Sequence, residues 1–282
     1  AGANTAIGIQ LFCLGTTLRV RDMGGVVKRG GVLLISKFVI GAAIGIVVGK
    51  VFGPTGVLGL SSLAIISAVT NSNGSIYLAL MNSYGDTVDQ AAMPLLAIND
   101  GPMLTMIAMG AGGLADIPLM ALVAAIGPIL VGMILGNIDK DLSDFLAPAG
   151  SILLPFVGFC LGSGMNLTNI AKGGVQGILL GLITCLIGGA FIMLCDKFIS
   201  RRPGYAGWAV ATTAGNAVAV PAVIAAADAT WAPWADIATS QVAASAILTA
   251  ILVPIITSWW AKKYGCPKFP KDEAQAALFA KD

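Results

Sequence analysis

Two polar stretches interrupt apolar segments of this sequence, and they contain the groups best suited to bind a ligand. The first, Thr70-Asn71-Ser72-Asn73-Gly74-Ser75, follows an apolar run that ends at Val69. The second, Thr212-Thr213-Ala214-Gly215-Asn216, is followed by Pro221. Asn, Ser and Gly compete with the helical backbone for hydrogen bonds, so each stretch predicts a broken helix. The second half of a broken helix begins with free N–H groups and a positive dipole end, which favour an anion.

Asp100 is the one acidic residue that we place deep within an apolar segment, where it follows Asn99. Burial disfavours the charged form of a carboxylate, so Asp100 is a candidate proton carrier or an anionic ligand for sodium. The alternative is a structural carboxylate, paired with Lys37 or hydrogen-bonded to the broken helix. The matching segment in the second half of the chain offers Gln241 and Ser245 but no acid. The candidate residues for ion coupling are Asp100, Asn99 and Gln241.

The composition predicts a membrane protein. Apolar residues make up 57% of the 282 residues and charged residues only 11%, with a mean hydropathy of +0.88. A soluble domain has about 25% charged residues. The net charge of +2 indicates no nucleic-acid partner, and with no histidine and no Cys-x-x-Cys pair we expect no metal site and no cofactor. An aspartyl protease needs two facing aspartates and a serine protease needs a base, so a transporter is favoured over an enzyme.

Nine segments are apolar and long enough to span a lipid bilayer. They are residues 1–19, 32–52, 57–84, 89–113, 117–137, 143–165, 173–196, 204–227 and 236–261. The linkers between them are short and hold most of the charge. Residues 264–282 form a polar C-terminal tail of mixed charge, which we expect to be disordered.

Four short matches recur in the same order at offsets of 143 to 149 residues, which indicates an internal repeat. The pairs are Phe12-Cys13-Leu14-Gly15 with Phe159-Cys160-Leu161-Gly162, Gly24-Gly25-Val26 with Gly173-Gly174-Val175, Thr70 and Asn73 with Thr213 and Asn216, and Leu104-Thr105-Met106-Ile107 with Leu248-Thr249-Ala250-Ile251. The second repeat, 117–263, has five segments and the first, 1–113, has four, so we expect a further helix before Ala1. An odd number of segments inverts the second copy in the membrane. Because the polar interruption recurs in both copies, we favour binding over the alternative that its residues only join helices.

The placement of lysine and arginine agrees with this inversion. Thirteen of these residues fall on one side of the predicted topology, Lys50 and Lys172 on the other, and Lys37 within a segment. Basic loops stay in the cytoplasm, so the side with thirteen, which includes the C-terminus, is predicted to be cytoplasmic. Lys37 lies about one and a half turns inside its segment, where we expect it to snorkel to the interface. A carboxylate-binding role for Lys37 is the less favoured alternative.

Several motifs resemble the 2-keto-3-deoxygluconate permease family. They are the Phe-Cys-Leu-Gly segment, residues 70–77 (Thr-Asn-Ser-Asn-Gly-Ser-Ile-Tyr), 99–107 (Asn-Asp-Gly-Pro-Met-Leu-Thr-Met-Ile) and 135–139 (Leu-Gly-Asn-Ile-Asp). The likeness extends from Ala1 to about Lys263 and implies a bile acid–sodium symporter-like fold. That fold is an all-α membrane protein of two inverted five-helix repeats, with a core domain, a panel domain and two broken helices crossing in the core.

The resemblance also implies proton-coupled symport of 2-keto-3-deoxygluconate, a small sugar-acid anion, into the cell across the bacterial inner membrane. The half-helix N-termini near Asn73 and Asn216 would suit its carboxylate, and Asn71, Ser75 and Thr213 would suit its hydroxyls. A sodium-coupled symporter of another small organic anion is the first alternative. A channel and a non-transporting receptor are less favoured, because inverted repeats with paired broken helices serve alternating access.

Overall fold

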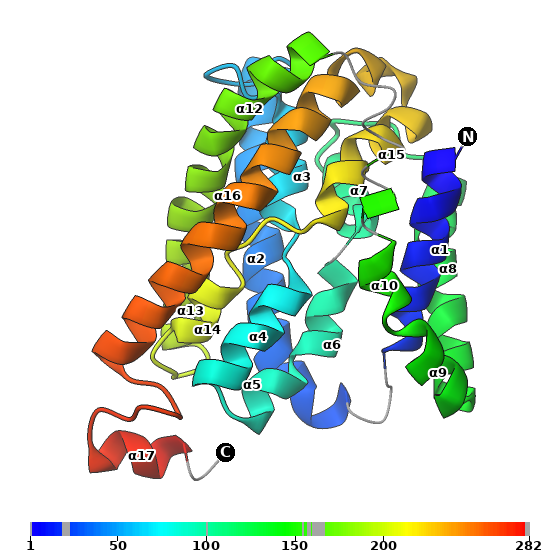
Figure 1. Ribbon diagram of the computed structural model, residues 1–282. Helices are drawn as coiled ribbons and strands as arrows, with labels where there is room; N and C mark the ends of the chain where they lie inside the picture. Colours follow the sequence, from blue (N-terminus) through cyan, green and yellow to red (C-terminus); the bar gives the residue numbers. More distant parts are fainter. Residues whose placement is uncertain are drawn as a thin grey trace.

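The computed structural model describes residues 2–18, 23–99, 101–153, 155–156, 159 and 167–279, and their regular structure is helical (Figure 1). The first half of the chain forms α1 (Gly2–Thr16), α2 (Met23–Phe52), α3 (Ser62–Thr70), α4 (Gly74–Tyr84), α5 (Thr87–Ala91), α6 (Met93–Leu96), the 3₁₀ turn η2 (Ala97–Asn99) and α7 (Pro102–Ala111). The second half forms α8 (Leu119–Ile138), α9 (Lys140–Leu146), α10 (Ala149–Ile152), α12 (Leu167–Leu182), the π-helical turn η3 (Ile183–Gly188), α13 (Gly189–Phe198), α14 (Tyr205–Ala209), the 3₁₀ turn η4 (Asn216–Ala219), α15 (Val220–Ala227), the 3₁₀ turn η5 (Ala229–Trp231), α16 (Ala232–Tyr264) and α17 (Glu273–Phe279). The predicted all-α class is confirmed.

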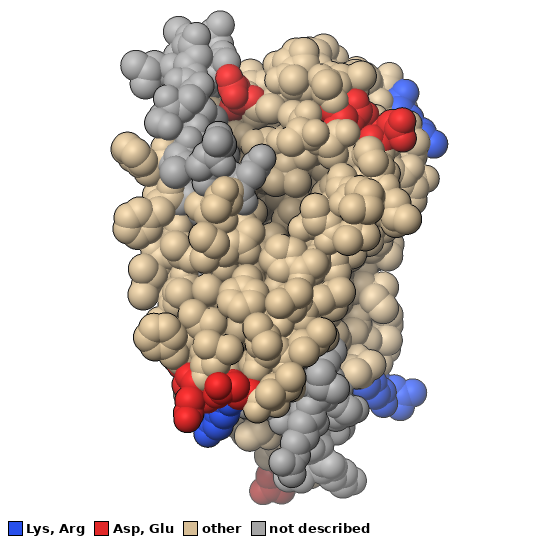
Figure 2. Space-filling model, turned by 90° about the vertical axis from the view of Figure 1, so that its right-hand side faces the viewer, with Lys and Arg blue, Asp and Glu red and all other residues tan. Residues whose placement is uncertain are grey.

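The helices have the lengths and the surface of a membrane protein. Five helical stretches of the described residues are long and apolar enough to span a bilayer: Val27–Phe52, Ser62–Tyr84, Leu119–Ile138, Gly173–Phe198 and Ala229–Tyr264. Shorter apolar helices at Thr5–Thr16, Pro102–Ala111 and Asn216–Ala227 fall in three more of the predicted segments. The remaining predicted segment, 143–165, is described in part and contains the end of α9 and all of α10; residues 154, 157–158 and 160–165 lie outside the described residues. On the face drawn in Figure 2, charged side chains lie toward the two ends, and a band without charge separates them.

Both predicted helix interruptions are present. α3 ends at Thr70 and α4 begins at Gly74, so residues 71–73 are unwound. α14 ends at Ala209 and the next helical turn begins at Asn216, so residues 210–215 are also unwound. The side chain of Asn73 caps α4 by accepting a hydrogen bond from the N–H of Ile76, as expected of Asn at a helix N-terminus. In Figure 1 the two interruptions lie about midway along the bundle.

A third interruption corrects the prediction of one continuous segment over residues 89–113. This stretch is divided into α5, α6, η2 and α7, and both α6 and α7 have proline in their first turn. Proline cannot donate the backbone hydrogen bond that would continue a preceding helix. Gly101, just before α7, has a φ of 152°, which favours glycine. The matching segment of the second half, α16, is a single helix from Ala232 to Tyr264.

Glycines on α2 allow it to lie directly against the broken helix α3. A Cβ atom at Gly41 would lie 2.6 Å from the backbone nitrogen of Thr70, and one at Gly45 would lie 2.5 Å from Cβ of Ile66. Residues four apart share one face of a helix, so these two glycines form a smooth strip along α2. Their small size brings the backbone of α2 to the end of α3, beside the unwound residues 71–73.

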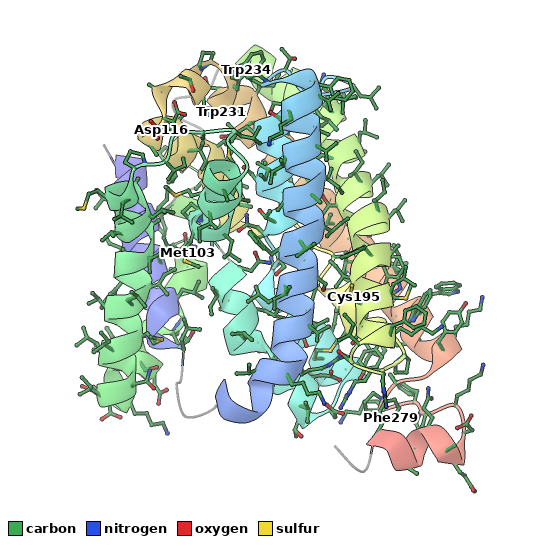
Figure 3. The ribbon with its side chains drawn as sticks, turned by 180° about the vertical axis from the view of Figure 1, so that it is seen from behind. Met103, Asp116, Cys195, Trp231, Trp234 and Phe279 are labelled. Atoms are coloured by element: carbon green, nitrogen blue, oxygen red, sulfur yellow. The ribbon has the colours of Figure 1, made fainter. Side chains whose placement is uncertain are left out.

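The C-terminal tail is folded through residue 279, which corrects the expectation of disorder over 264–282. Cys266 is buried and forms an isolated antiparallel bridge with Phe269, and α17 follows. The guanidinium of Arg202 lies 5.8 Å from the centre of the Phe279 ring. Figure 3 shows Phe279 on α17 at one extreme end of the molecule. The tail therefore packs against the end of the bundle at which α13 leads into α14.

Candidate binding site where the helix breaks meet

The two interruptions touch each other in the interior of the bundle. The backbone N–H of Asn73 donates a hydrogen bond of 2.8 Å to Oγ1 of Thr212, which joins the first unwound stretch to the second. In Figure 1 the link between α14 and α15 crosses the junction of α3 and α4. Lys37 Nζ, on α2, donates to the carbonyl oxygen of Thr212 at 2.9 Å. Three separate parts of the chain thus converge on Thr212.

Asn71 connects the end of α3 to the third interruption. Its Nδ2 donates to the carbonyl of Ser67 at 2.9 Å and to Oγ1 of Thr105 at 3.0 Å. Its Oδ1 accepts from the N–H of Gly101 at 3.0 Å. Oγ1 of Thr105 also shares a hydrogen bond of 2.8 Å with Oγ1 of Thr70. In this conformation the amide of Asn71 is therefore bonded within the protein.

Thr213 is bonded internally in a similar way. Its backbone N–H donates to Oγ1 of Thr249 at 2.9 Å, and its Oγ1 shares a hydrogen bond of 2.8 Å with Oγ of Ser245. Both partners lie on α16 and are fully buried. Ser75, in contrast, is exposed on the first turn of α4. The predicted substrate residues thus lie around the two interruptions. The polar groups of Asn71 and Thr213 are bonded within the protein, whereas Ser75 is exposed.

Two amide oxygens beside the interruptions are buried without a hydrogen-bond partner among the described residues. They are Oδ1 of Asn99 and Oδ1 of Asn216. Asn99 uses only its Nδ2, which donates to Oγ of Ser72 at 3.3 Å. A buried acceptor without a donor is costly, so native proteins rarely keep one unless a water, an ion or a ligand completes it. These two oxygens are the clearest local sign of a binding site.

Gln241 lies apart from the other predicted coupling residues. Its Oε1 accepts from the N–H of Ser61 at 3.1 Å. Ser61 caps the start of α3, and the nine residues of that helix separate it from the unwound residues 71–73 by about 13 Å. The structure therefore places Asn99 at the interruptions and Gln241 at the far end of α3. Asp100 lies outside the described residues.

Lys37 is fully buried, which corrects the expectation that it snorkels to the interface. Its exposed fraction is 0%, and its ammonium points across the bundle to the carbonyl of Thr212. The face of α2 that bears Lys37 and Gly41 packs against α3, and α13 packs against α2 as well. Lys37 therefore lies beside the two interruptions and not at the surface.

A buried ion network lies at one end of the bundle, and the sequence interpretation missed it. Arg29 bonds to Asp89 at 2.8 Å and to both carboxylate oxygens of Asp196. Arg202 bonds to Asp86 at 2.6 Å and to Asp89 at 3.1 Å. Both arginines are 4% exposed, while Asp89 and Asp196 are fully buried. The network joins α2, α5, α13 and the loop before α14.

No local pattern marks this network, because each member lies near the end of an apolar segment, where charges usually face water. Burial alone would lower the pKa of the Arg202 guanidinium, but the adjoining Asp89 carboxylate raises it above its ordinary value. Arg202 therefore stays charged. Each buried charge has a partner, and removing one member would leave buried donors or acceptors of the others without a bond.

A family model described as 2-keto-3-deoxygluconate permease matches residues 1–266. The chain belongs to the 2-keto-3-deoxygluconate permease family. It is 47% identical over 262 residues to 2-keto-3-deoxygluconate permease 1 of Salmonella typhimurium, covering 93% of this chain and 82% of that protein. It is 38% identical over 280 residues to the 2-keto-3-deoxygluconate permease of an Enterobacter species, covering 98% and 84%. It is 38% identical over 267 residues to the 2-keto-3-deoxygluconate permease of Bacillus subtilis, covering 93% of this chain and 81% of that protein.

Membership of the 2-keto-3-deoxygluconate permease family confirms the resemblance found in the sequence motifs. The relatives are permeases, so the prediction of a transporter in place of an enzyme is confirmed as well. Together with the apolar helices, the family makes this chain a multi-pass protein of the inner membrane.

Proposed function

We propose that this chain is a secondary active transporter that carries 2-keto-3-deoxygluconate, a small sugar-acid anion, into the cell together with a proton. The names of its relatives supply the substrate. The observation that carries the proposal is the contact between two helix interruptions inside the bundle, Asn73 N–H to Thr212 Oγ1. Unwound backbone at such a depth serves ion and substrate binding in transporters with inverted repeats.

The substrate would bind beside this contact. The N-terminus of α4, where the N–H groups of Gly74 and Ser75 have no intrahelical acceptor and the helix dipole is positive, suits the carboxylate. The unpartnered Oδ1 atoms of Asn99 and Asn216 can accept hydrogen bonds from sugar hydroxyls. Ser75 is exposed on the same turn of α4 and can add a hydroxyl partner. Asn71 and Thr213 would join the site only after exchanging their present hydrogen bonds.

Matched contacts in the two halves of the chain support an inverted repeat of residues 1–113 and 117–263. Thr70 bonds to Thr105, and the corresponding Thr213 bonds to Thr249. These four residues are the equivalent positions of the sequence repeat. We infer that both halves descend from one packing unit, which appears once in each membrane orientation.

Two groups of helices would move against each other during transport. The panel would consist of α1, α8, α9 and α10, which lie together at one side of Figure 1, and the core of the helices that contain or pack on the interruptions. A cavity of about 250 Å³ separates them, lined by Ile7 and Leu11 of α1, Ala125 of α8, Met106 of α7 and Val223 of α15. Its apolar lining would allow the core to rock without breaking hydrogen bonds, which gives alternating access.

The coupling ion is proposed to be a proton, with Asp100 as the carrier that the sequence predicts. Sodium is the second candidate, because the free oxygens of Asn99 and Asn216 are ligands of a kind that hard cations accept. In either case, the basic ends of the segments and the C-terminus would face the cytoplasm.

Uptake of labelled 2-keto-3-deoxygluconate into liposomes tests this function. An imposed inward proton gradient is expected to drive accumulation without sodium. If Asp100 carries the proton, Asp100→Asn abolishes accumulation but keeps substrate binding. Accumulation driven by sodium alone would show that sodium is the coupling ion. If neither gradient drives uptake, the substrate assignment is wrong. If Asp100→Asn still accumulates the sugar acid under a proton gradient, another titratable group carries the proton.

Two asparagines at the interruptions are expected to behave differently when replaced by alanine. Asn216→Ala should raise KM for the sugar acid about three- to tenfold, because its free Oδ1 is available to the substrate. Asn71→Ala should lower stability by about 1–3 kcal/mol, because its partners lose their hydrogen bonds. Uptake kinetics and thermal unfolding in detergent measure both effects. Equal loss of stability in the two variants, with KM unchanged in Asn216→Ala, would contradict the assignment.

A further inference from the structure

Lys37 places an amino group in the interior of the bundle. Its side chain has no exposed surface, and its described hydrogen bond goes to a neutral acceptor, the carbonyl of Thr212. That carbonyl belongs to the unwound stretch 210–215. No carboxylate among the described residues forms an ion pair with Lys37.

Among the described residues, the charged and titratable groups on the elements packed against α2 do not compensate Lys37. The described residues of α3, α6 and α7 contain none. On α5 and α13, Asp89 and Asp196 are already bonded to Arg29, which lies about 12 Å from Lys37 along α2. The remaining groups on the packed elements are Cys185 in η3 and Cys195 and Lys197 on α13. Cysteine thiols supply no fixed negative charge, and Lys197 is itself a cation.

An ammonium with one carbonyl partner is poorly compensated inside a membrane protein. It can lose its proton and remain as a neutral amine that still donates to Thr212. It can also stay charged if an anion arrives. The proposed substrate is such an anion, and its own charge is equally unfavourable in this interior. The ammonium and the carboxylate would therefore compensate each other's charge.

We propose that Lys37, in place of Asp100, carries the coupling proton and that its ammonium pairs with the carboxylate of the sugar acid. The proposal rests on the proton symport of the proposed function and changes only the residue that carries the proton. In the unloaded carrier the neutral amine is bonded to the Thr212 carbonyl. In the loaded carrier one proton and one monoanion have entered together, so the site is again neutral. Carriers loaded with only one of the two would bury an unpaired charge and would not change orientation.

The same geometry favours a proton over sodium at this position. Unwound carbonyls at the end of a half-helix bind the coupling cation in other transporters of inverted design. Here the carbonyl of Thr212 follows the end of α14 and already accepts a hydrogen bond from Lys37. The amino group occupies the place that a sodium ion would need.

The test replaces Lys37 with arginine, which keeps the positive charge but cannot release a proton. In liposomes, Lys37→Arg is expected to exchange labelled for unlabelled 2-keto-3-deoxygluconate, because exchange needs only the loaded carrier. It should not accumulate the sugar acid, and an internal pH dye should report no proton entry. Lys37→Met, which lacks the charge, should bind the sugar acid at least about thirtyfold more weakly. Lys50→Arg, near the end of the same helix, is the matched control and should transport normally.

Accumulation with proton entry in Lys37→Arg would overturn the proposal while leaving proton symport intact. If the unmodified protein accumulates no sugar acid under any gradient, the proposed function itself is wrong. If Lys37→Arg does not fold, calorimetry in two buffers of different ionisation heat gives a second test. The unmodified protein should take up about one proton per sugar acid bound, and Lys37→Gln should take up none. Proton uptake retained in Lys37→Gln would overturn the role of Lys37.

Discussion

Replacement of Asp89 with alanine is expected to destabilise the protein by about 3–5 kcal/mol, a large part of the stability of most domains. Asp89 is fully buried and receives hydrogen bonds from Arg29, Arg202 and the hydroxyl of Tyr205. Without it, Asp86 and Asp196 remain as the described carboxylate partners of the two guanidinium groups. The penalty comes from buried donors that lose their charged acceptor, namely Nε of Arg29 and the hydroxyl of Tyr205.

Thermal unfolding in detergent, followed by the loss of monodisperse protein on size exclusion, measures this effect. Asp236→Ala is the matched control, because Asp236 is exposed on α16 and should change stability by no more than about 0.5 kcal/mol. Asp89→Asn keeps the shape but not the charge, so it should fall between the two. An unfolding temperature for Asp89→Ala equal to that of the control would mean that the network contributes little.

Gly41→Ala is expected to weaken both folding and transport. The added methyl group would lie 2.6 Å from the backbone nitrogen of Thr70 and 2.7 Å from the carbonyl carbon of Val69. Backbone atoms cannot move aside as a flexible side chain would, so α2 must shift away from α3. Overpacking of this kind costs about 1–3 kcal/mol. The shift would also draw Lys37, one turn earlier, away from Thr212.

Gly31→Ala on the same helix separates this clash from the general effect of alanine. A Cβ atom at Gly31 has open space around it, and alanine favours the helix by about 1 kcal/mol relative to glycine. We therefore expect Gly31→Ala to be neutral or slightly stabilising and to transport normally. Uptake rates and unfolding temperatures of the two variants should diverge; matching values would show that α2 and α3 tolerate a wider spacing.

Local sequence determined the features that depend on neighbouring residues. Asn71 to Gly74 and Thr212 to Asn216 predicted the two interruptions, because Asn, Ser and Gly weaken a helix wherever they occur in a row. The apolar segments predicted the membrane helices, since their length and composition suffice for that conclusion. The motif around residues 99–107 pointed to the family without any knowledge of contacts.

Only the tertiary structure decided which polar residues meet. Arg29 pairs with Asp89 and Asp196, which are 60 and 167 residues away, so no periodicity could place them together. Gln241 matched Asp100 by sequence position, yet it lies on α16 and bonds to Ser61, at the end of α3 opposite to the interruption. Lys37 was expected at the interface because a lysine near a segment end usually reaches water. The close approach of α2 and α3, which depends on the absence of side chains at Gly41 and Gly45, instead encloses it beside Thr212. Burial is a property of the assembled bundle, and in this protein it encloses Lys37 as well as Arg29, Asp89 and Asp196, which lie far apart in the sequence.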